Sequence, residues 1–298
     1  MTLHRLRPRT LVSLLIVFGI LAASRRTEAF PPPVPLVITN PGFEANPVAT
    51  NCFQGFIPSG WTLYDPNGIY DGAVDAVGGL NTQPGGPHFI NGAPEGEHVA
   101  LVFLQGDIGG GPMGLMQALS DVLETNTHYT LTVQVGNIAS GQGPPPCDVF
   151  GFFDLDGFPG YQVQLLAGGM IIAQDNNSLA DTIDEGEWGL VTIQISIGES
   201  HPQAGLPLEI RLINLNMIDS PVDPGFEVDF DDVRLQQGCP ADGDIDADED
   251  IDLDDAALFV DVLLELEMDP LYADRADMDC SGYADAADLR PLLTALVN

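Results

Sequence analysis

The chain has 298 residues and a formal net charge of −35, because 44 Asp and Glu residues face only nine basic residues, all of them Arg. A surface this acidic repels nucleic acid and anionic membranes, so both are excluded as partners, whereas it attracts cations such as Ca²⁺. The length suits one domain of ordinary size followed by a small second one.

The N-terminus has the features of a secretory signal peptide, assigned to residues 1–29. A basic stretch is followed by an apolar run at 11–23, which is too short to span a bilayer comfortably, and then by small residues. Cleavage is expected after Ala23 or near Ala29, and an uncleaved N-terminal anchor is the alternative. No later segment has the length and apolarity of a membrane span, so we expect a secreted protein, extracellular or at the cell surface.

Residues 30–236 are predicted to form one β-sandwich domain after a Pro-rich start. Runs rich in β-branched and aromatic residues occur at 36–39, 60–64, 98–103, 128–135, 161–166, 188–197, 208–215 and 226–235. Clusters of Gly, Pro, Asn and Asp separate these runs, and no periodic helix lies between them. Many short strands with this punctuation are typical of an antiparallel sandwich.

Four cysteines are present, at positions 52, 147, 239 and 280. An even number in an exported chain favours two disulfides, although the sequence alone allows three connectivities. None of the cysteines has the spacing of a metal-binding pair, which argues against zinc.

Several short motifs of the β domain resemble exported bacterial jelly-roll domains of the galactose-binding-like type. They include NPGFEAN (40–46), IPSGW (57–61), GYQVQLLAGG (160–169) and FEVDFDDVRL (226–235). Many members of that group are carbohydrate-binding modules. The resemblance implies a structural calcium shared by Glu44 and either Asp231 or Asp232, which would pin the first strand to the last. Two solvated carboxylates at a sheet edge are the alternative.

Sugar binding requires flat aromatic faces beside hydrogen-bonding groups. Loop aromatics are the candidates, although packing is the favoured role for any single one of them: Tyr64, Tyr70, Phe89, Phe150, Phe153 and Phe158. The chain has no GxSxG, HExxH or P-loop motif, and its histidines are spread singly. We therefore assign no catalytic residue, and whether the chain is an enzyme stays open.

The acidic segment 244–255, DIDADEDIDLDD, has the ligand spacing of a twelve-residue calcium loop. Its positions 1, 3, 5, 7, 9 and 12 are Asp244, Asp246, Asp248, Asp250, Asp252 and Asp255. A second loop 33 residues later supplies Asp277, Asp279, Ser281, the carbonyl of Tyr283, Asp285 and Asp288. The apolar helical stripe behind each loop repeats with the same offset. A disordered acidic tail, the alternative, would not repeat both patterns.

This duplicated loop and helix, residues 239–298, resembles a type I dockerin. The resemblance implies two Ca²⁺ ions, a cohesin-like or other protein domain as partner, and association with polysaccharide breakdown. Glu249 stands where such loops usually have Gly, which puts the first loop in some doubt. A Cys239–Cys280 bridge would clamp the two loops and leave Cys52 and Cys147 as the second pair, whereas free buried thiols are the alternative.

The fold class expected is therefore mainly β: an antiparallel jelly-roll sandwich with a small all-α, EF-hand-like module at the C-terminus. The function expected is an exported, non-catalytic protein that binds a polysaccharide or glycan through the sandwich and a protein through the module. A cell-surface or matrix protein with a calcium-stabilised anchor is the first alternative, and a cryptic O-glycosyl hydrolase is the second.

Overall fold

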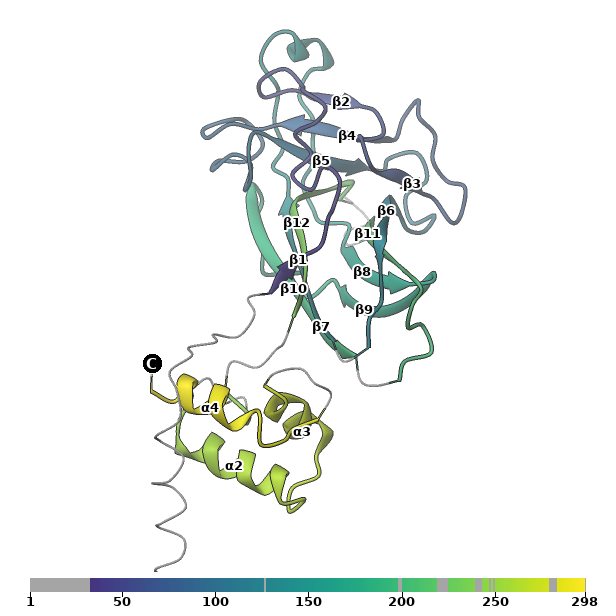
Figure 1. Ribbon diagram of the computed structural model, residues 1–298. Helices are drawn as coiled ribbons and strands as arrows, with labels where there is room; N and C mark the ends of the chain where they lie inside the picture. Colours follow the sequence, from purple (N-terminus) through teal and green to yellow (C-terminus); the bar gives the residue numbers. More distant parts are fainter. Residues whose placement is uncertain are drawn as a thin grey trace, which may run out of the picture. The chain divides into compact units, whose positions relative to one another are not determined.

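The computed structural model describes residues 33–125, 127–197, 200–218, 225–238, 243–246, 248, 250–278 and 283–297 (Figure 1). The expected signal peptide lies outside the described residues, as do Cys239, Asp279, Cys280 and Ser281. Among the described helices, none has the length and apolarity needed to cross a membrane.

Two antiparallel sheets form a sandwich, which confirms the mainly β class (Figure 1). The larger sheet has the order β10-β7-β12-β5-β4-β2, with β1 paired to β12, and the smaller has the order β3-β6-β11-β8-β9. The strands of the larger sheet are β1 (Val34–Pro35), β2 (Phe53–Gly55), β4 (Ala76–Asn81), β5 (His98–Phe103), β7 (Thr127–Asn137), β10 (Glu187–Ile197) and β12 (Glu227–Gly238). Those of the smaller are β3 (Thr62–Tyr64), β6 (Met113–Val122), β8 (Tyr161–Ala167), β9 (Met170–Asn176) and β11 (Pro207–Asn214).

Strands β2, β4, β6 and β9 are absent from the sequence-based expectation. The expectation placed a turn at GGLNTQPGGP, yet Gly78 and Gly79 lie inside β4. A Cβ atom on Gly78 would collide with the carbonyl oxygen of Gln54 on β2, so the close approach of two backbones requires glycine there. Glycine in this strand is therefore a packing requirement and not a turn signal.

The main core lies between the two sheets. Alternate residues of β5 and β12, such as Val102, Val228 and Phe230, point into it and meet Leu115 and Leu212 of the smaller sheet. The other face of the larger sheet is also covered, because a second apolar cluster packs there with Leu80, Phe89, Val99, Leu101, Ile138 and Leu155. Both faces of β12 are consequently buried from Glu227 to Asp231, which sets the environment of the acidic residues there.

The C-terminal segment contains three described helices: α2 (Leu253–Leu263), α3 (Pro270–Ala276) and α4 (Leu289–Ala295). The sequence interpretation placed one helix after each acidic loop and none before, but α3 precedes the second loop. The apolar stripe is only partly buried, since Phe259 and Leu292 are enclosed whereas Val260 and Leu293 are about half exposed.

Candidate active site

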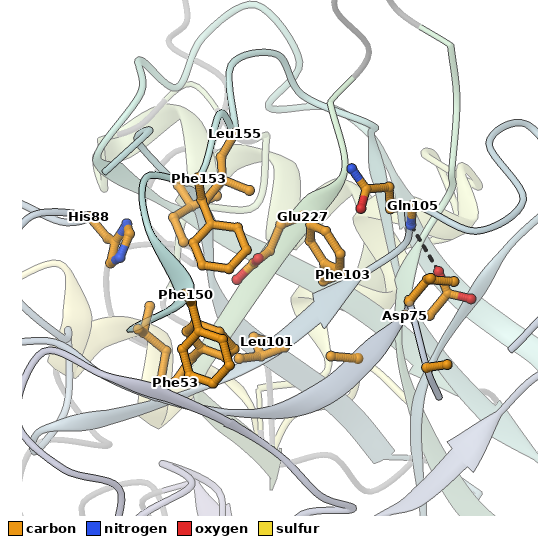
Figure 2. A pocket seen from close by; sticks show the side chains of 15 residues that line it. Phe53, Asp75, His88, Leu101, Phe103, Gln105, Phe150, Phe153, Leu155 and Glu227 are labelled. Atoms are coloured by element: carbon orange, nitrogen blue, oxygen red, sulfur yellow. Dashed lines mark hydrogen bonds between the residues drawn. The ribbon is translucent and has the colours of Figure 1, made fainter. Parts of the chain in front are cut away.

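A cavity of about 320 Å³ opens on the face of the larger sheet that is turned away from the smaller sheet (Figure 2). Strands β2, β4, β5 and β12 form its floor, and the loops around residues 73–75, 88, 138 and 150–155 form its walls. The lining is dominated by apolar side chains, among them four phenylalanines: Phe53, Phe103, Phe150 and Phe153. A cavity of this size and character suits a small, flat, largely apolar molecule.

Glu227 is the acid at the centre of this apolar surface. It is the first residue of β12 and lies opposite Phe103 in the strand register, and its carboxyl group projects into the cavity between Phe103 and Phe153 (Figure 2). Burial raises the pKa of Glu227 to about 7. Near neutral pH the cavity therefore contains a carboxylic acid that can donate a proton.

Asp229 lies two residues further along β12 on the same face and is fully buried. No N–H or hydroxyl donor of the described residues reaches either of its oxygens, and the side-chain group that it meets is the Glu227 carboxyl. Burial and the charge of Glu227 raise the pKa of Asp229 well above its usual value. Two buried carboxyls in contact cannot both ionise without cost, so the pair retains a proton.

The other polar groups of the cavity wall are held by the protein itself. The Asp75 carboxylate accepts hydrogen bonds from the backbone N–H groups of Gln105, Gly106 and Asp71, at 2.9, 2.7 and 2.9 Å. His88 Nδ1 is 3.0 Å from the carbonyl oxygen of Ala139 and so carries the proton that this acceptor requires. Burial lowers the pKa of His88, which keeps its ring neutral.

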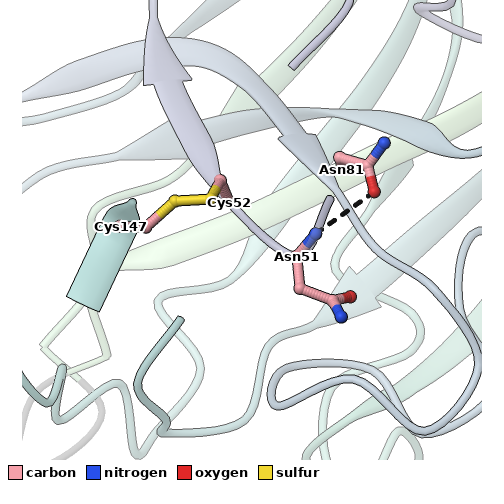
Figure 3. Close-up of a disulfide and its surroundings, with 4 residues drawn as sticks. All are labelled: Asn51, Cys52, Asn81 and Cys147. Carbon is pink, nitrogen blue, oxygen red and sulfur yellow. Dashed lines mark hydrogen bonds between the residues drawn. A yellow bond between two sulfur atoms is a disulfide. The ribbon is translucent and has the colours of Figure 1, made fainter. Parts of the chain in front are cut away.

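The aromatic wall comes from segments far apart in sequence. The ring of Phe53 lies 5.1 Å from that of Phe150 and 5.3 Å from that of Phe153, the latter edge to face. A disulfide between Cys52 and Cys147 joins the two segments that carry these rings (Figure 3). This pairing is one of those that the sequence left open.

The six predicted sugar-contacting aromatics do not form one site. Phe150 and Phe153 line the cavity, but Phe89 is fully buried and stacks on Trp188 at 4.3 Å. Tyr64 lies on β3 beneath the Arg211 guanidinium, at 4.7 Å, and Tyr70 and Phe158 pack against the main core. Four of the six therefore serve packing or surface contacts away from the cavity.

Glu44 and Asp231, which the sequence predicts to share a cation, both hold the segment 95–98 by hydrogen bonds. Glu44 accepts from the backbone N–H groups of Glu97 and His98 at 2.6 and 2.7 Å, and Asp231 accepts from that of Glu95 at 2.8 Å. Asp232 pairs with Arg234 at 2.6 Å. The turn that carries Glu44 and the last strand, β12, are thus connected through residues 95–98, and the shared cation stays a prediction.

In the first acidic loop, Asp244, Asp246 and Asp255 bring carboxylate oxygens within 4.8 Å of one another. Among the described residues no other group of three potential ligands does so. Asp255 is buried at the start of α2, where its oxygens accept the N–H groups of Ile245, at 2.6 Å, and Asp252, at 2.8 Å.

The second acidic loop repeats part of this geometry. The backbone N–H of Asp285 donates to the Asp288 carboxylate at 2.7 Å, as that of Asp252 does to Asp255.

The other expected ligands of the first loop, Asp248, Asp250 and Asp252, do not belong to the group formed by Asp244, Asp246 and Asp255.

Comparison with protein families gives a match over residues 34–236 to the HpiC1-like family, described as HpiC1 cyclase. The Stig cyclase Fisc from Fischerella sp. TAU, solved with (3Z)-3-(1-methyl-2-pyrrolidinylidene)-3H-indole, is 38% identical, with a TM-score of 0.59 over 69% of this chain and 98% of that one.

Two further structures give similar values. A cyclase from Fischerella sp. TAU, solved with 4-(1H-indol-3-yl)butan-2-one, is 39% identical, with a TM-score of 0.60 over 68% of this chain and 97% of that one. An apo cyclase from Fischerella sp. is 36% identical, with a TM-score of 0.60 over 69% of this chain and 96% of that one. No curated protein matches the chain.

These similarities correct the functional interpretation of the sequence. The recognition of a dockerin behind a carbohydrate-binding module was wrong, and so was the non-catalytic, calcium-dependent binding role in polysaccharide breakdown with its two alternatives. The motifs quoted for the β domain are short strand and turn signatures of a sandwich, and such signatures specify a fold but not a ligand. The partners that the dockerin resemblance implied stay an untested prediction.

Sequence reasoning also missed the central acid. FEVDFDDVRL was interpreted as a closing strand with carboxylates at its edge, and Glu227 and Asp229 received no role. The signal was present: acids and apolar residues alternate, so that Glu227, Asp229 and Asp231 share one face and Val228, Phe230 the other. Acids at alternate positions of a strand that is buried on both faces indicate a functional site.

Proposed function

Because this chain belongs to the HpiC1-like cyclase family, we propose that it is a cyclase that closes a ring on an indole-bearing small molecule. The observation that carries this proposal is Glu227, a carboxyl group whose pKa burial raises to about 7, in a cavity otherwise lined mainly by apolar and aromatic side chains. Such a site provides general-acid catalysis where water does not compete for the proton.

The chemistry proposed for Glu227 is reversible protonation of the substrate. A 3H-indole, the ring type bound by Fisc, has an sp² ring nitrogen with a free lone pair, which accepts a proton from a carboxylic acid. The N–H bond forms as the O–H bond of Glu227 breaks, and the substrate becomes an electron-poor cation. After the new ring has closed, the Glu227 carboxylate takes a proton back, so substrate and product are isomers and no oxidant is needed.

The surrounding aromatic residues would stabilise that cation. Phe103 and Phe153 lie on either side of Glu227, and Phe53 lines the same cavity beside Phe150 (Figure 2). A cation over an aromatic face gains about 0.5–2 kcal/mol, more where water is excluded. The neighbouring Asp229 acts differently, because its hydrogen bond lowers the pKa of Glu227, whereas burial and the charge of Glu227 raise the pKa of Asp229.

Binding of two indole compounds to wild type and Glu227→Gln tests this assignment by calorimetry near neutral pH. We expect the variant to bind the 3H-indole ligand of Fisc at least about tenfold more weakly, since charge-assisted hydrogen bonds contribute about 1.5–3 kcal/mol. Binding of 4-(1H-indol-3-yl)butan-2-one should change less, because its ring nitrogen is no base and the glutamine amide still donates to its ketone. An equal loss for both ligands would rule out proton donation by Glu227.

The finer description of the sandwich as a galactose-binding-like jelly roll belongs to the proposal as well. It is supported by the strand order of the larger sheet, in which β12, the last strand, lies between β7 and β5 and pairs with β1, the first.

Cation binding by the C-terminal loops is a second proposal, favoured by the close group of Asp244, Asp246 and Asp255. Three converging carboxylates supply hard oxygen ligands of the kind that Ca²⁺ takes. Titration of Ca²⁺ into the full chain, with Asp246→Ala beside it, tests for the site.

Export of the chain is a third proposal. The Cys52–Cys147 disulfide supports it, since such bonds persist mainly in oxidising compartments. Sequencing the N-terminus of the mature protein would show whether residues 1–29 are removed, and a full-length product in the cytosol would contradict export.

A further inference from the structure

One wall of the cavity is a short segment that we call the flap, residues 147–153, in the connection between β7 and β8. It begins with a 3₁₀ turn, Cys147–Phe150, and three of its apolar side chains are uncovered: Val149 is 78% exposed, Phe150 60% and Phe152 66%. Large apolar side chains grouped on a surface in this way mark a binding site more often than chance.

The two ends of the flap are held differently. At its C-terminal end, Gly141 and Phe153 exchange two backbone hydrogen bonds, of 3.0 and 2.8 Å, and the Ser140 hydroxyl accepts from Leu155 N–H at 2.7 Å. At its N-terminal end, the disulfide to Cys52 ties Cys147 to the segment leading into β2, with the two Cα atoms 5.7 Å apart. The N-terminal end thus has a covalent attachment to the larger sheet.

The disulfide connects two segments that carry cavity-lining aromatics (Figure 3). Cys52 directly precedes Phe53, and Cys147 lies three residues before Phe150, so the disulfide limits how far the backbones that carry the two rings can separate. The rings of Phe53 and Phe150 meet at 5.1 Å and 45°. Phe53 is mostly covered, whereas Phe150 contacts it and leaves most of its own surface open at the cavity mouth.

We propose that Phe150 is a specificity-determining residue, whose open face stacks on the flat ring of the bound substrate and which the Cys52–Cys147 disulfide holds in place. This inference rests on the proposed function, since it takes an aromatic small molecule as the ligand of the cavity. Phe150 and Phe53, whose rings contact each other, would form two adjoining walls of a slot that accepts a planar ring and disfavours a bulky aliphatic one. The flap thereby selects the shape of the substrate, while Glu227 acts on it.

Phe152 provides a matched control in the same segment. It is as exposed as Phe150, but it does not line the cavity. Replacing either by alanine removes a similar area of exposed apolar surface, and only Phe150→Ala removes a ring from the proposed slot. Phe150→Leu keeps apolar bulk without a flat face and separates stacking from simple contact.

The experiment measures the dissociation constant of 4-(1H-indol-3-yl)butan-2-one for the full chain by calorimetry. Since an aromatic pair contributes to affinity beyond the area that it buries, we expect Phe150→Ala to bind about three- to tenfold more weakly. Phe150→Leu should fall in between, and Phe152→Ala should stay within about twofold of wild type. The double variant Cys52→Ala/Cys147→Ala should weaken binding toward the level of Phe150→Ala while the cavity residues remain present.

Failure of this inference and failure of the proposed function give different results. If wild type does not bind the indole probe, the proposed function falls and the role of Phe150 falls with it. If wild type binds and Glu227→Gln behaves as expected, but Phe150→Ala and Phe152→Ala bind equally, only the role of Phe150 is refuted. Thermal unfolding of each variant checks that it is folded. If Phe150→Ala does not fold, the comparison is made with Phe150→Leu.

Discussion

Replacing Glu227 by glutamine should change the pH dependence of folding stability as well as ligand binding. The folded protein keeps the Glu227 proton up to about pH 7, because burial raises the pKa of this group, whereas a glutamate in the unfolded chain releases it near its ordinary pKa of 4.5. Between these two pH values the unfolded state binds fewer protons than the folded state. The free energy of unfolding of the wild type therefore falls as pH rises through this window. Below and above the window, Glu227 adds no further pH dependence to it.

The size of this effect follows from the shift in pKa. Each pKa unit corresponds to 1.36 kcal/mol, so the rise from 4.5 to about 7 corresponds to a loss of about 3 kcal/mol across the window. Glutamine does not ionise, so Glu227→Gln should not show this loss. Asp229 is buried in both proteins, and the difference between them reports Glu227 together with its contact to Asp229.

Urea unfolding of both proteins, followed by tryptophan fluorescence at several values between about pH 4.5 and pH 8, measures the difference. As pH rises through this range, we expect the free energy of unfolding of the variant to increase by about 3 kcal/mol relative to that of the wild type. Two curves that run parallel across the range would refute the reasoning. They would mean that Glu227 ionises in the folded protein as it does in water, and such a group could not act as a neutral-pH acid.

Three further predictions concern the support of the site and the acidic loops. Removing the disulfide with Cys52→Ser/Cys147→Ser should lower the free energy of unfolding by about 4 kcal/mol, since it closes a loop of 95 residues, and unchanged urea stability would contradict this. Gly136→Ala would place a Cβ atom 2.8 Å from the rings of Phe89 and Trp188, and should cost about 1–3 kcal/mol, whereas Gly55→Ala, with its nearest neighbour at 3.9 Å, should be nearly neutral in the same assay. Asp246→Ala should remove one Ca²⁺ site in calorimetric titration of the full chain, while Asp261→Ala on α2 should leave the titration unchanged, and equal loss in both would point to diffuse charge attraction.

The sequence by itself determined the antiparallel β class and many of its strands. β5 coincides with the expected run at 98–103, and β7, β8, β10, β11 and β12 agree to within a few residues. Strand periodicity and turn residues are local properties, and for that reason they can be read along the chain. β4 was missed because Gly78 and Gly79 look like turn residues in the sequence. In the structure, a side chain at either position would collide with neighbouring segments, with the backbone of β2 at Gly78 and with the Phe56 side chain at Gly79.

Only the tertiary structure decided where the site lies and what it does. The alternation in β12 shows that Glu227 and Asp229 share a face, but it does not show that loops around Ile138 and Leu155 cover that face. That cover comes from segments far away in sequence, and it turns an ordinary edge carboxylate into a protonated acid. Burial, and with it the pKa, is a collective property of the folded chain, so the local alternation could mark these acids as unusual but could not show that their pKa values are raised.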